Sequence, residues 1–252
     1  MQFKQAGNKE RPVILLLHGG GLSWWSFAPV IKLLRDEYHI VTPILDGHGE
    51  DGAEPFMSIE AAAEKLIAYI DTAFGGHVFA LGGLSIGAQI TLELLSRRPD
   101  IASYAVLESA LVLPMKSVRL LAAPMYRLCY GLTKRKWFSK LQANAFCLPE
   151  SMFEAYYMDG QNISCASLIS MALSNSSYSL KPSIAQIRAK TLIITGEREL
   201  AIMKRSAQML HTAIPQAERY VAPAMKHGEL SLLHPEKYVM LLRAFFRGTF
   251  HP

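Results

Sequence analysis

The sequence has few cysteines, and their positions argue against the usual cysteine-based sites. Its 252 residues include only Cys129, Cys147 and Cys165, and no two of them form a C-x-x-C pair. Cysteine-coordinated zinc centres and dithiol redox motifs are typically built on such pairs. We therefore expect three free thiols in a reducing compartment, and neither a metal site nor a cofactor.

Long apolar segments are also missing. No uninterrupted apolar run reaches 18 residues, the length that would suggest a membrane-spanning helix. Residues 1–5 lack the apolar core of a secretory signal. These two absences favour a cytoplasmic protein without stable membrane insertion.

Positive charge is only modestly in excess, since the net charge is +5. The densest basic stretch, Lys134–Lys136, is followed at once by Trp137 and Phe138. A nucleic-acid-binding surface needs a longer basic stripe, so we expect no nucleic-acid partner. Half of the residues are hydrophobic, which is enough for a large buried core.

Strand-like and helix-like segments alternate along most of the chain. Residues 12–17 form a continuous apolar run, typical of a strand buried on both faces of a parallel sheet. Further strands are expected at residues 38–43, 77–81, 104–107, 191–195 and 218–221, and helices at residues 27–37, 58–74, 88–96, 203–212 and 235–247. Ser58 is the expected N-cap of the second helix. The alternation predicts an α/β fold, a mostly parallel twisted sheet with helices on both faces.

The alternation stops between residues 111 and 180, where the chain is helical in character and has no buried-strand pattern. This interruption is too long for a loop. We predict an inserted helical lid at 111–180, on a core made of residues 1–110 and 181–252. Aromatic and methionine side chains in the lid suit an adaptable apolar pocket. They are Met115, Met125, Tyr126, Tyr130, Trp137, Phe138, Phe146, Met152, Phe153, Tyr156, Tyr157 and Met158.

A five-residue motif, Gly83-Leu84-Ser85-Ile86-Gly87, stands between an apolar strand-like run and a helix-like run. In this context G-x-S-x-G predicts a nucleophile elbow, a sharp turn that exposes the serine. Glycines fit on both sides because the turn brings backbones close together. Ser85 is therefore the candidate nucleophile.

A second glycine-rich loop, His18-Gly19-Gly20-Gly21, follows the first buried strand. It is the expected source of one oxyanion donor, the N–H of Gly20, with Gly21 as an alternative. The N–H of Ile86, the residue after the serine, supplies the other donor of this oxyanion hole. Trp24 and Trp25 follow this loop and are candidates to line the pocket.

His227 is the best candidate base, because it lies in a loop between the last strand and the last helix, where ligand chemistry occurs in open α/β sheets. Glu199, 28 residues earlier, is the candidate acid that orients it. Glu197 and Glu108 remain alternative acids. Six of the other histidines occupy weaker positions for a base: His18, His48, His77, His211, His234 and His251.

Taken together, these motifs resemble the α/β-hydrolase superfamily over nearly the whole chain, and the order serine, acid, histidine is the one this superfamily uses. The resemblance implies a catalytic triad of Ser85, His227 and Glu199, although Asp is usual where Glu199 stands. Asp46-Gly47-His48-Gly49 matches a loop of the superfamily that is mostly structural. The usual opening antiparallel strands must be shortened here to little more than residues 2–5.

The predicted function is that of a carboxylesterase-like serine hydrolase, acting on small to medium apolar acyl esters through an acyl-enzyme on Ser85. A dehalogenase of this fold needs a carboxylate in place of Ser85. Thioesterases, lactonases and carbon–carbon hydrolases use the same triad and remain alternatives. A ligand-binding protein without turnover is the alternative of a different class.

Overall fold

A computed structural model describes residues 1–250 of the chain. Within these residues, a seven-stranded sheet runs through the centre of the molecule. Its strands are β1 (Gln2–Ala6), β2 (Val13–Leu17), β3 (His39–Ile44), β4 (Val78–Leu84), β5 (Ala102–Glu108), β6 (Lys190–Gly196) and β7 (Glu218–Ala222). They lie in the order β1-β3-β2-β4-β5-β6-β7. β1 is antiparallel to β3, whereas all other neighbours are parallel. The opening region thus contributes a single short antiparallel strand, as expected.

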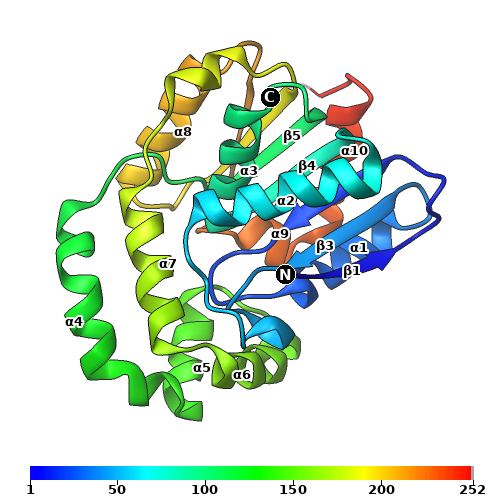
Figure 1. Ribbon diagram of the computed structural model, residues 1–252. Coiled ribbons are helices and arrows are strands. Elements are labelled where there is room, and N and C mark those ends of the chain that lie inside the picture. Colours follow the sequence, from blue (N-terminus) through cyan, green and yellow to red (C-terminus); the bar gives the residue numbers. More distant parts are fainter. Residues whose placement is uncertain (251–252) are drawn as a thin grey trace.

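Helices cover both faces of this sheet (Figure 1). One layer consists of α2 (Ile59–Phe74), α3 (Ile86–Arg97) and α8 (Ala201–Ala213). The opposite layer consists of α1 (Ala28–Leu34), α9 (Glu229–Leu233) and α10 (Pro235–Phe246). The short 3-10 turns are η1 (Trp24–Phe27), η2 (Gly49–Asp51), η3 (Glu150–Met152) and η4 (Pro182–Gln186). This arrangement confirms the predicted α/β fold.

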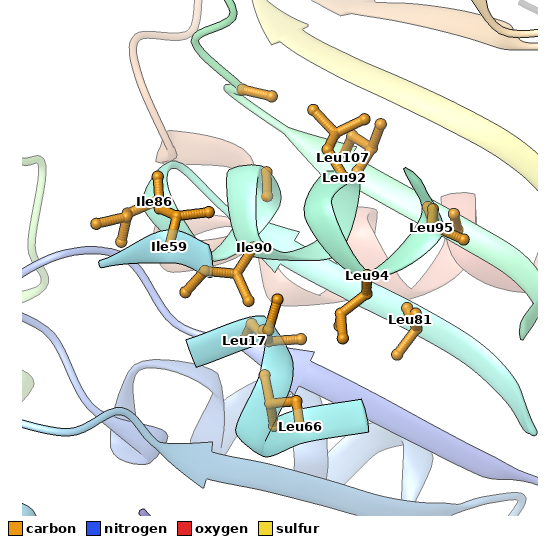
Figure 2. Packing of buried hydrophobic residues seen from close by; sticks show 14 of the residues in the cluster. Leu17, Ile59, Leu66, Leu81, Ile86, Ile90, Leu92, Leu94, Leu95 and Leu107 are labelled. Atoms are coloured by element: carbon orange, nitrogen blue, oxygen red, sulfur yellow. The ribbon is translucent and has the colours of Figure 1, made fainter. Parts of the chain in front are cut away.

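Alternation of side chains along the central strands explains the two layers. Leu15 and Leu17 of β2 pack into the core under α2 and α3, whereas Ile14 and Leu16 pack into the core under α1 and α10. Successive strand residues point to opposite faces, so a continuous apolar run fits a strand covered on both sides. Figure 2 shows Leu17 close to side chains of the first layer.

Four helices lie between β5 and β6, and we call them the cap helices. They are α4 (Lys116–Thr133), α5 (Lys136–Ala145), α6 (Phe153–Asn162) and α7 (Cys165–Ser177). They lie to one side of the sheet, with α4 at the outer edge beside α7 (Figure 1). Within residues 1–250, no helix has the length and apolar character needed to cross a bilayer.

Most element boundaries differ from the sequence expectations by a few residues. β4 extends to Leu84 and α3 begins at Ile86, so only Ser85 separates the strand from the helix. Ser58 caps α2 as expected, since its side chain accepts a hydrogen bond from the backbone N–H of Ala61 at 3.1 Å. The expected helix at 27–37 is shorter at both ends, because α1 begins at Ala28 after a 3-10 turn and ends at Leu34. The short helix α9 was not predicted.

Candidate active site

Ser85 occupies a strained turn between β4 and α3. Its backbone has φ 56° and ψ −116°, a region that costs a non-glycine residue about 1–3 kcal/mol. The turn is held on both sides, because the N–H of Ser85 donates to the carbonyl of Glu108 (2.9 Å) and its carbonyl accepts from the N–H of Gln89 (3.1 Å). The side chain remains partly exposed at the N-terminus of α3. The geometry is that of a nucleophile elbow.

The two glycines of the motif have no room for a side chain. A Cβ on Gly83 would lie 2.3 Å from the carbonyl oxygen of Gly87. A Cβ on Gly87 would lie 2.2 Å from the carbonyl oxygen of Leu17, at the end of β2. Both distances are shorter than carbon–oxygen contacts allow, so the close packing of the elbow against β2 requires glycine at both positions.

A cavity of about 320 Å³ opens beside Ser85. Gly20, Gly21 and Ile86 line it together with the serine. Gly20 lies directly against Ile86, since a Cβ on Gly20 would be 3.6 Å from Ile86 Cγ2. The structure thus brings the predicted oxyanion donors to the same cavity as Ser85. The remaining lining comes from the cap: Val118, Tyr126, Thr133, Ser139, Gln142, Phe146, Tyr156, Gly160, Ile163, Leu168, Met171, Ala172 and Asn175.

His227 and Glu199 form a hydrogen-bonded pair, with Nδ1 of the imidazole 3.0 Å from Oε2 of the carboxylate. The Glu199 side chain is fully buried, whereas 42% of the His227 side chain is exposed. Burial by itself raises the pKa of Glu199, but hydrogen bonds and the charge of His227 outweigh it, so this pKa lies below its usual value. An ionised carboxylate only accepts, so Nδ1 carries the proton and Nε2 is left as the basic nitrogen.

Two further donors hold the Glu199 carboxylate in place. Its Oε1 accepts from the hydroxyl of Ser109 at 2.7 Å and from the N–H of Gly196 at 2.9 Å. Ser109 is buried directly after β5 and has φ 55°. Sequence patterns did not indicate this residue, because a serine after a strand has no distinctive spacing. Its place next to Glu108, at the C-terminal end of a strand, was the one available signal.

The loop of His227 packs against the elbow through the neighbouring residues. The N–H of Gly228 donates to the Ser109 hydroxyl at 3.2 Å. A Cβ on Gly228 would lie 3.0 Å from Leu84 Cδ1, and Leu84 immediately precedes Ser85. The imidazole therefore belongs to the same edge of the sheet as the serine, although His227 itself is outside the set of residues that line the 320 Å³ cavity.

The two alternative acids have other partners. Glu197 Oε2 accepts from the backbone N–H of Ala224 at 2.6 Å. Glu108 is buried, and its Oε1 accepts from the N–H of Ser231 at 3.2 Å. Burial raises the pKa of Glu108 to about 7, and the charge of Glu199 acts in the same direction. Of the three carboxylates, Glu199 is the one that contacts His227.

His18, the histidine of the glycine-rich loop, has a structural environment. It is fully buried; its Nδ1–H donates to the Gly19 carbonyl at 2.9 Å, and its Nε2 accepts from the Leu45 N–H at 3.1 Å. Burial lowers its pKa to about 3. Both ring nitrogens are occupied, so the neutral ring ties the loop after β2 to the chain after β3.

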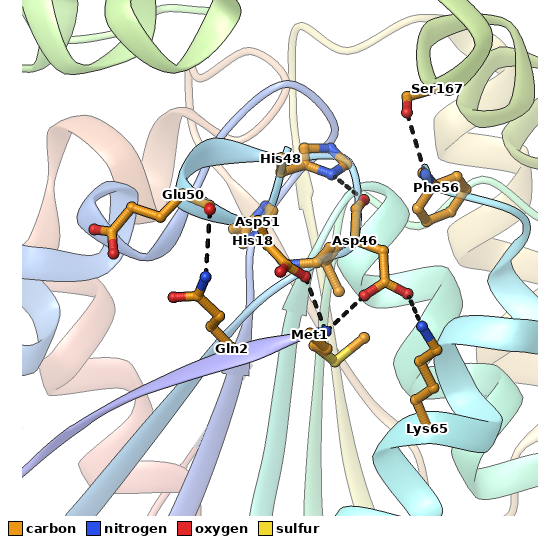
Figure 3. Close-up of polar contacts among 11 residues, drawn as sticks. Met1, Gln2, His18, Asp46, His48, Glu50, Asp51, Phe56, Lys65 and Ser167 are labelled. Carbon is orange, nitrogen blue, oxygen red and sulfur yellow. Dashed lines mark hydrogen bonds and ion pairs between the residues drawn. The ribbon is translucent and has the colours of Figure 1, made fainter. Parts of the chain in front are cut away.

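The loop that contains Asp46 and His48 is also held by internal contacts (Figure 3). Asp46 pairs with Lys65 at 2.7 Å and with the terminal ammonium of Met1 at 2.9 Å. His48 Nδ1 lies 3.0 Å from the Asp46 carbonyl. Asp51, in the same loop, pairs with the terminal ammonium of Met1 at 2.9 Å. These contacts hold the loop in place and engage the Asp46 carboxylate away from the serine.

The structure places Trp24 and Trp25 elsewhere, which corrects their expected position at the pocket. The lining of the cavity within residues 1–250 includes neither of them. The indole N–H of Trp25 donates to Asp159 at 2.7 Å, and Lys4 lies 5.8 Å from the centre of the Trp24 ring. Both residues belong to the 3-10 turn η1. Residues of α7, among them Met171, form that wall instead and were not predicted.

The described residues contain no group of three or more His, Cys, Asp or Glu side chains arranged to hold a metal ion. The three cysteines are free and half-buried. The groups described at the site are a hydroxyl, an imidazole, a carboxylate and backbone N–H groups.

Comparison with known proteins agrees with this geometry. Residues 14–241 match the model of a family described as "Alpha/beta hydrolase family". A curated relative, the pimeloyl-[acyl-carrier protein] methyl ester esterase of Neisseria meningitidis, is 26% identical over 251 residues, which cover 94% of each chain.

Two solved structures show the same fold at low sequence identity. A thermophilic esterase from Thermogutta terrifontis superposes with a TM-score of 0.80 and 18% identity, over 99% of this chain and 94% of that one. An enol-lactonase from Burkholderia xenovorans superposes with a TM-score of 0.82 and 16% identity, over 98% and 96%.

Proposed function

Because the chain belongs to the alpha/beta hydrolase family, we propose that it is a serine hydrolase that cleaves carboxylic esters of small to medium apolar acids. The observation that carries this proposal is the 3.0 Å hydrogen bond between His227 and Glu199 at the same sheet edge as the strained Ser85. A relative that aligns over nearly the whole chain is named as a methyl ester esterase, which supports ester chemistry.

In the proposed first step, Nε2 of His227 accepts the proton of the Ser85 hydroxyl while its oxygen attacks the ester carbonyl. Glu199 holds the proton on Nδ1 and stabilises the imidazolium that forms. The imidazolium then donates its Nε2 proton to the departing alcohol. The acyl group remains on Ser85 as an ester.

In the proposed second step, His227 accepts a proton from water, whose oxygen attacks the acyl-enzyme. The carboxylic acid leaves and Ser85 recovers its proton from His227. In both steps the N–H groups of Gly20 and Ile86 hold the oxyanion. Loss of one such donor typically costs about 3–4 kcal/mol of barrier.

The cavity supports the proposed substrate size. Its volume of about 320 Å³ is at the lower end of the range for small-molecule pockets. Apolar side chains such as Val118, Leu168 and Met171 form much of its wall. Such a wall favours an aliphatic or aromatic acyl group over a charged one.

Hydrolysis of a panel of substrates tests the proposal. The panel contains p-nitrophenyl esters of increasing acyl length, together with thioesters, lactones and a carbon–carbon substrate. We expect the highest kcat/KM on a short or medium ester, and loss of this activity in Ser85→Ala. Ser103→Ala, on the exposed part of β5, serves as the matched control and should retain it. Full activity in Ser85→Ala, or no turnover of any panel member, would refute the proposal.

A further inference from the structure

The outward surface of α4 and α5 is both apolar and basic, and we propose that it docks on the headgroup layer of an anionic lipid bilayer. We call it the α4–α5 surface. It comprises Lys116, Arg119, Leu120, Leu121, Met125, Arg127, Leu128, Leu132, Arg135, Trp137 and Leu141, all exposed. Docking of this kind is adsorption at the interface, without insertion of a helix across the membrane.

Large apolar side chains stand in solvent on this surface. Leu128 is 86% exposed, Leu120 is 77% exposed and Trp137 is 63% exposed. Met125 and Leu141 are exposed to a similar degree. Single exposed apolar residues are common, but a group of this size on neighbouring turns marks an interaction site. Leucine and tryptophan are the residues that interfacial helices bury at the level of the acyl chains and headgroups.

The charge of this region is of one sign. Between Glu108 and Glu150 the sequence contains seven Lys or Arg residues and no Asp or Glu. Lys136 and Lys140 pair with Glu154 and Glu150 of the neighbouring segment.

Lys134 is also occupied, because it donates to backbone carbonyls at the end of α6. In the described part of the chain, Lys116, Arg119, Arg127 and Arg135 form no ion pair. These four cations are available to lipid phosphates, and each basic residue near an anionic leaflet adds to the attraction.

The position of α4 gives it access to a flat partner. It forms the outer edge of the cap and packs on α7 through its inner side, where Ala122 is buried (Figure 1). Leu121, Met125, Leu128 and Leu132 follow one another at spacings of three or four residues, so they share one side of the helix. This exposed side of α4 therefore carries an apolar stripe, whereas Arg119 and Arg127 lie further round the same helix.

An apolar groove of about 510 Å³ links this surface to the active-site cavity. Leu121, Met125 and Leu132 belong to both the groove and the α4–α5 surface. The groove also shares walls with the cavity, namely Val118, Tyr126, Thr133, Gln142 and Ala172. An apolar chain that leaves a bilayer at α4 therefore meets continuous lining as far as the cavity beside Ser85. This continuity favours a lipid surface over an acidic protein as the partner.

Co-sedimentation with lipid vesicles tests the proposal and does not depend on hydrolysis. The full chain is mixed with vesicles of phosphatidylcholine alone, or of phosphatidylcholine with one third phosphatidylglycerol. Two double variants test the apolar and the basic side chains of the surface separately. They are Leu120→Gln/Leu128→Gln and Arg119→Gln/Arg127→Gln. None of these four residues lines the cavity or the groove. Matched controls on other faces are Met209→Gln/Met240→Gln and Arg188→Gln/Arg205→Gln, and circular dichroism verifies that every variant is folded.

We expect the wild-type chain to sediment with the anionic vesicles and only weakly with the neutral ones. The leucine pair should weaken the partition coefficient by about tenfold or more, and the arginine pair by about fivefold for each arginine removed. Both control pairs should match the wild type. Wild-type chain that stays in the supernatant with both vesicle types would overturn the proposal, as would variants that sediment as well as the wild type.

The same samples test two other partners for the α4–α5 surface, a second copy of this chain and an acidic protein. A wild-type chain that binds neither vesicle but forms a dimer in light scattering, lost in Leu120→Gln/Leu128→Gln, would assign the surface to a second copy and overturn the proposal. Wild-type chain that binds an acidic carrier protein and ignores the anionic vesicles would also overturn it.

Discussion

The hydroxyl of Ser109 lies 2.7 Å from Oε1 of Glu199 and donates to it. The two residues are 90 positions apart in the chain, and they meet because β5 and β6 are neighbours in the sheet. Since the other carboxylate oxygen binds His227, Ser109 orients the imidazole through Glu199.

Replacing Ser109 by alanine tests this positioning. Ser109→Ala removes one donor to Glu199 and leaves the buried N–H of Gly228 without its acceptor. We expect a loss of about 1–3 kcal/mol in the free energy of unfolding, measured by urea denaturation. If Ser109 positions the triad, kcat for an ester should fall by roughly tenfold, with KM unchanged. Ser103→Ala is the control. A variant that loses stability but keeps kcat would restrict Ser109 to a structural role.

The identity of the acid is tested by comparing two nearby glutamates. Glu199→Gln removes the charge that fixes the proton on Nδ1 of His227, so kcat should fall by roughly 10³–10⁴. Glu197→Gln is the matched control, because the new amide oxygen still accepts from Ala224, and its kcat should stay within about twofold of the wild type. Steady-state kinetics decide between them. Equal losses in the two variants would show that Glu199 is not the acid.

Glu108 predicts a pH dependence of stability. Its pKa is raised by burial from the model-compound value of 4.5 to about 7, so the folded state binds this proton more tightly than the unfolded state. The resulting stabilisation is complete below about pH 4.5 and is lost as the pH rises through about 7. Between these two pH limits the free energy of unfolding should differ by roughly 3 kcal/mol. Glu108→Gln, which does not titrate, should lack this decline.

Urea denaturation between pH 4.5 and 8 measures that difference. The free energy of unfolding of Glu108→Gln should gain roughly 3 kcal/mol relative to the wild type across this interval. Glu54→Gln, at an exposed glutamate, should follow the wild type. Parallel curves for the wild type and Glu108→Gln would contradict the assigned pKa.

Replacing glycine by alanine should change the free energy of unfolding in opposite directions at Gly87 and Gly131. In Gly87→Ala the new methyl group meets the carbonyl oxygens of Leu17 and His18 at 2.2 and 2.6 Å, so the backbone must move. We expect a loss of about 3 kcal/mol or more in the free energy of unfolding, together with loss of ester hydrolysis. Gly131→Ala, in α4 with no atom within 4 Å of its Cβ, should be stabilising by up to about 1 kcal/mol. Equal thermal unfolding of both variants would argue against a tight elbow.

The sequence predicted the sheet and the elbow because both follow from local rules. A continuous apolar run defines β2, and two glycines around Ser85 define a turn with no space for Cβ. The pairing of His227 with Glu199 was predicted from chain order and loop position. Distinguishing Glu199 from Glu197 required coordinates, because the two lie on the same turn and only their direction differs.

Contacts between distant segments were beyond local patterns. Nothing in the local sequence distinguishes Ser109, and its role depends on β6, which places Glu199 beside it. Trp25 was assigned to the pocket because it follows the glycine loop, but η1 turns it towards Asp159, which is 134 residues away. The wall formed by α7 depends on how the cap helices pack, and hydrophobic periodicity alone does not determine that packing.

The most direct test of the central claim is the location of a covalent adduct after treatment with a fluorophosphonate. The probe requires an activated serine, so intact mass should rise by one phosphonyl group, and peptide mapping should place that group on Ser85. The wild type should label rapidly, and Ser85→Ala should not label at all. A wild-type chain that stays unlabelled, or an adduct on another residue that persists in Ser85→Ala, would contradict the account.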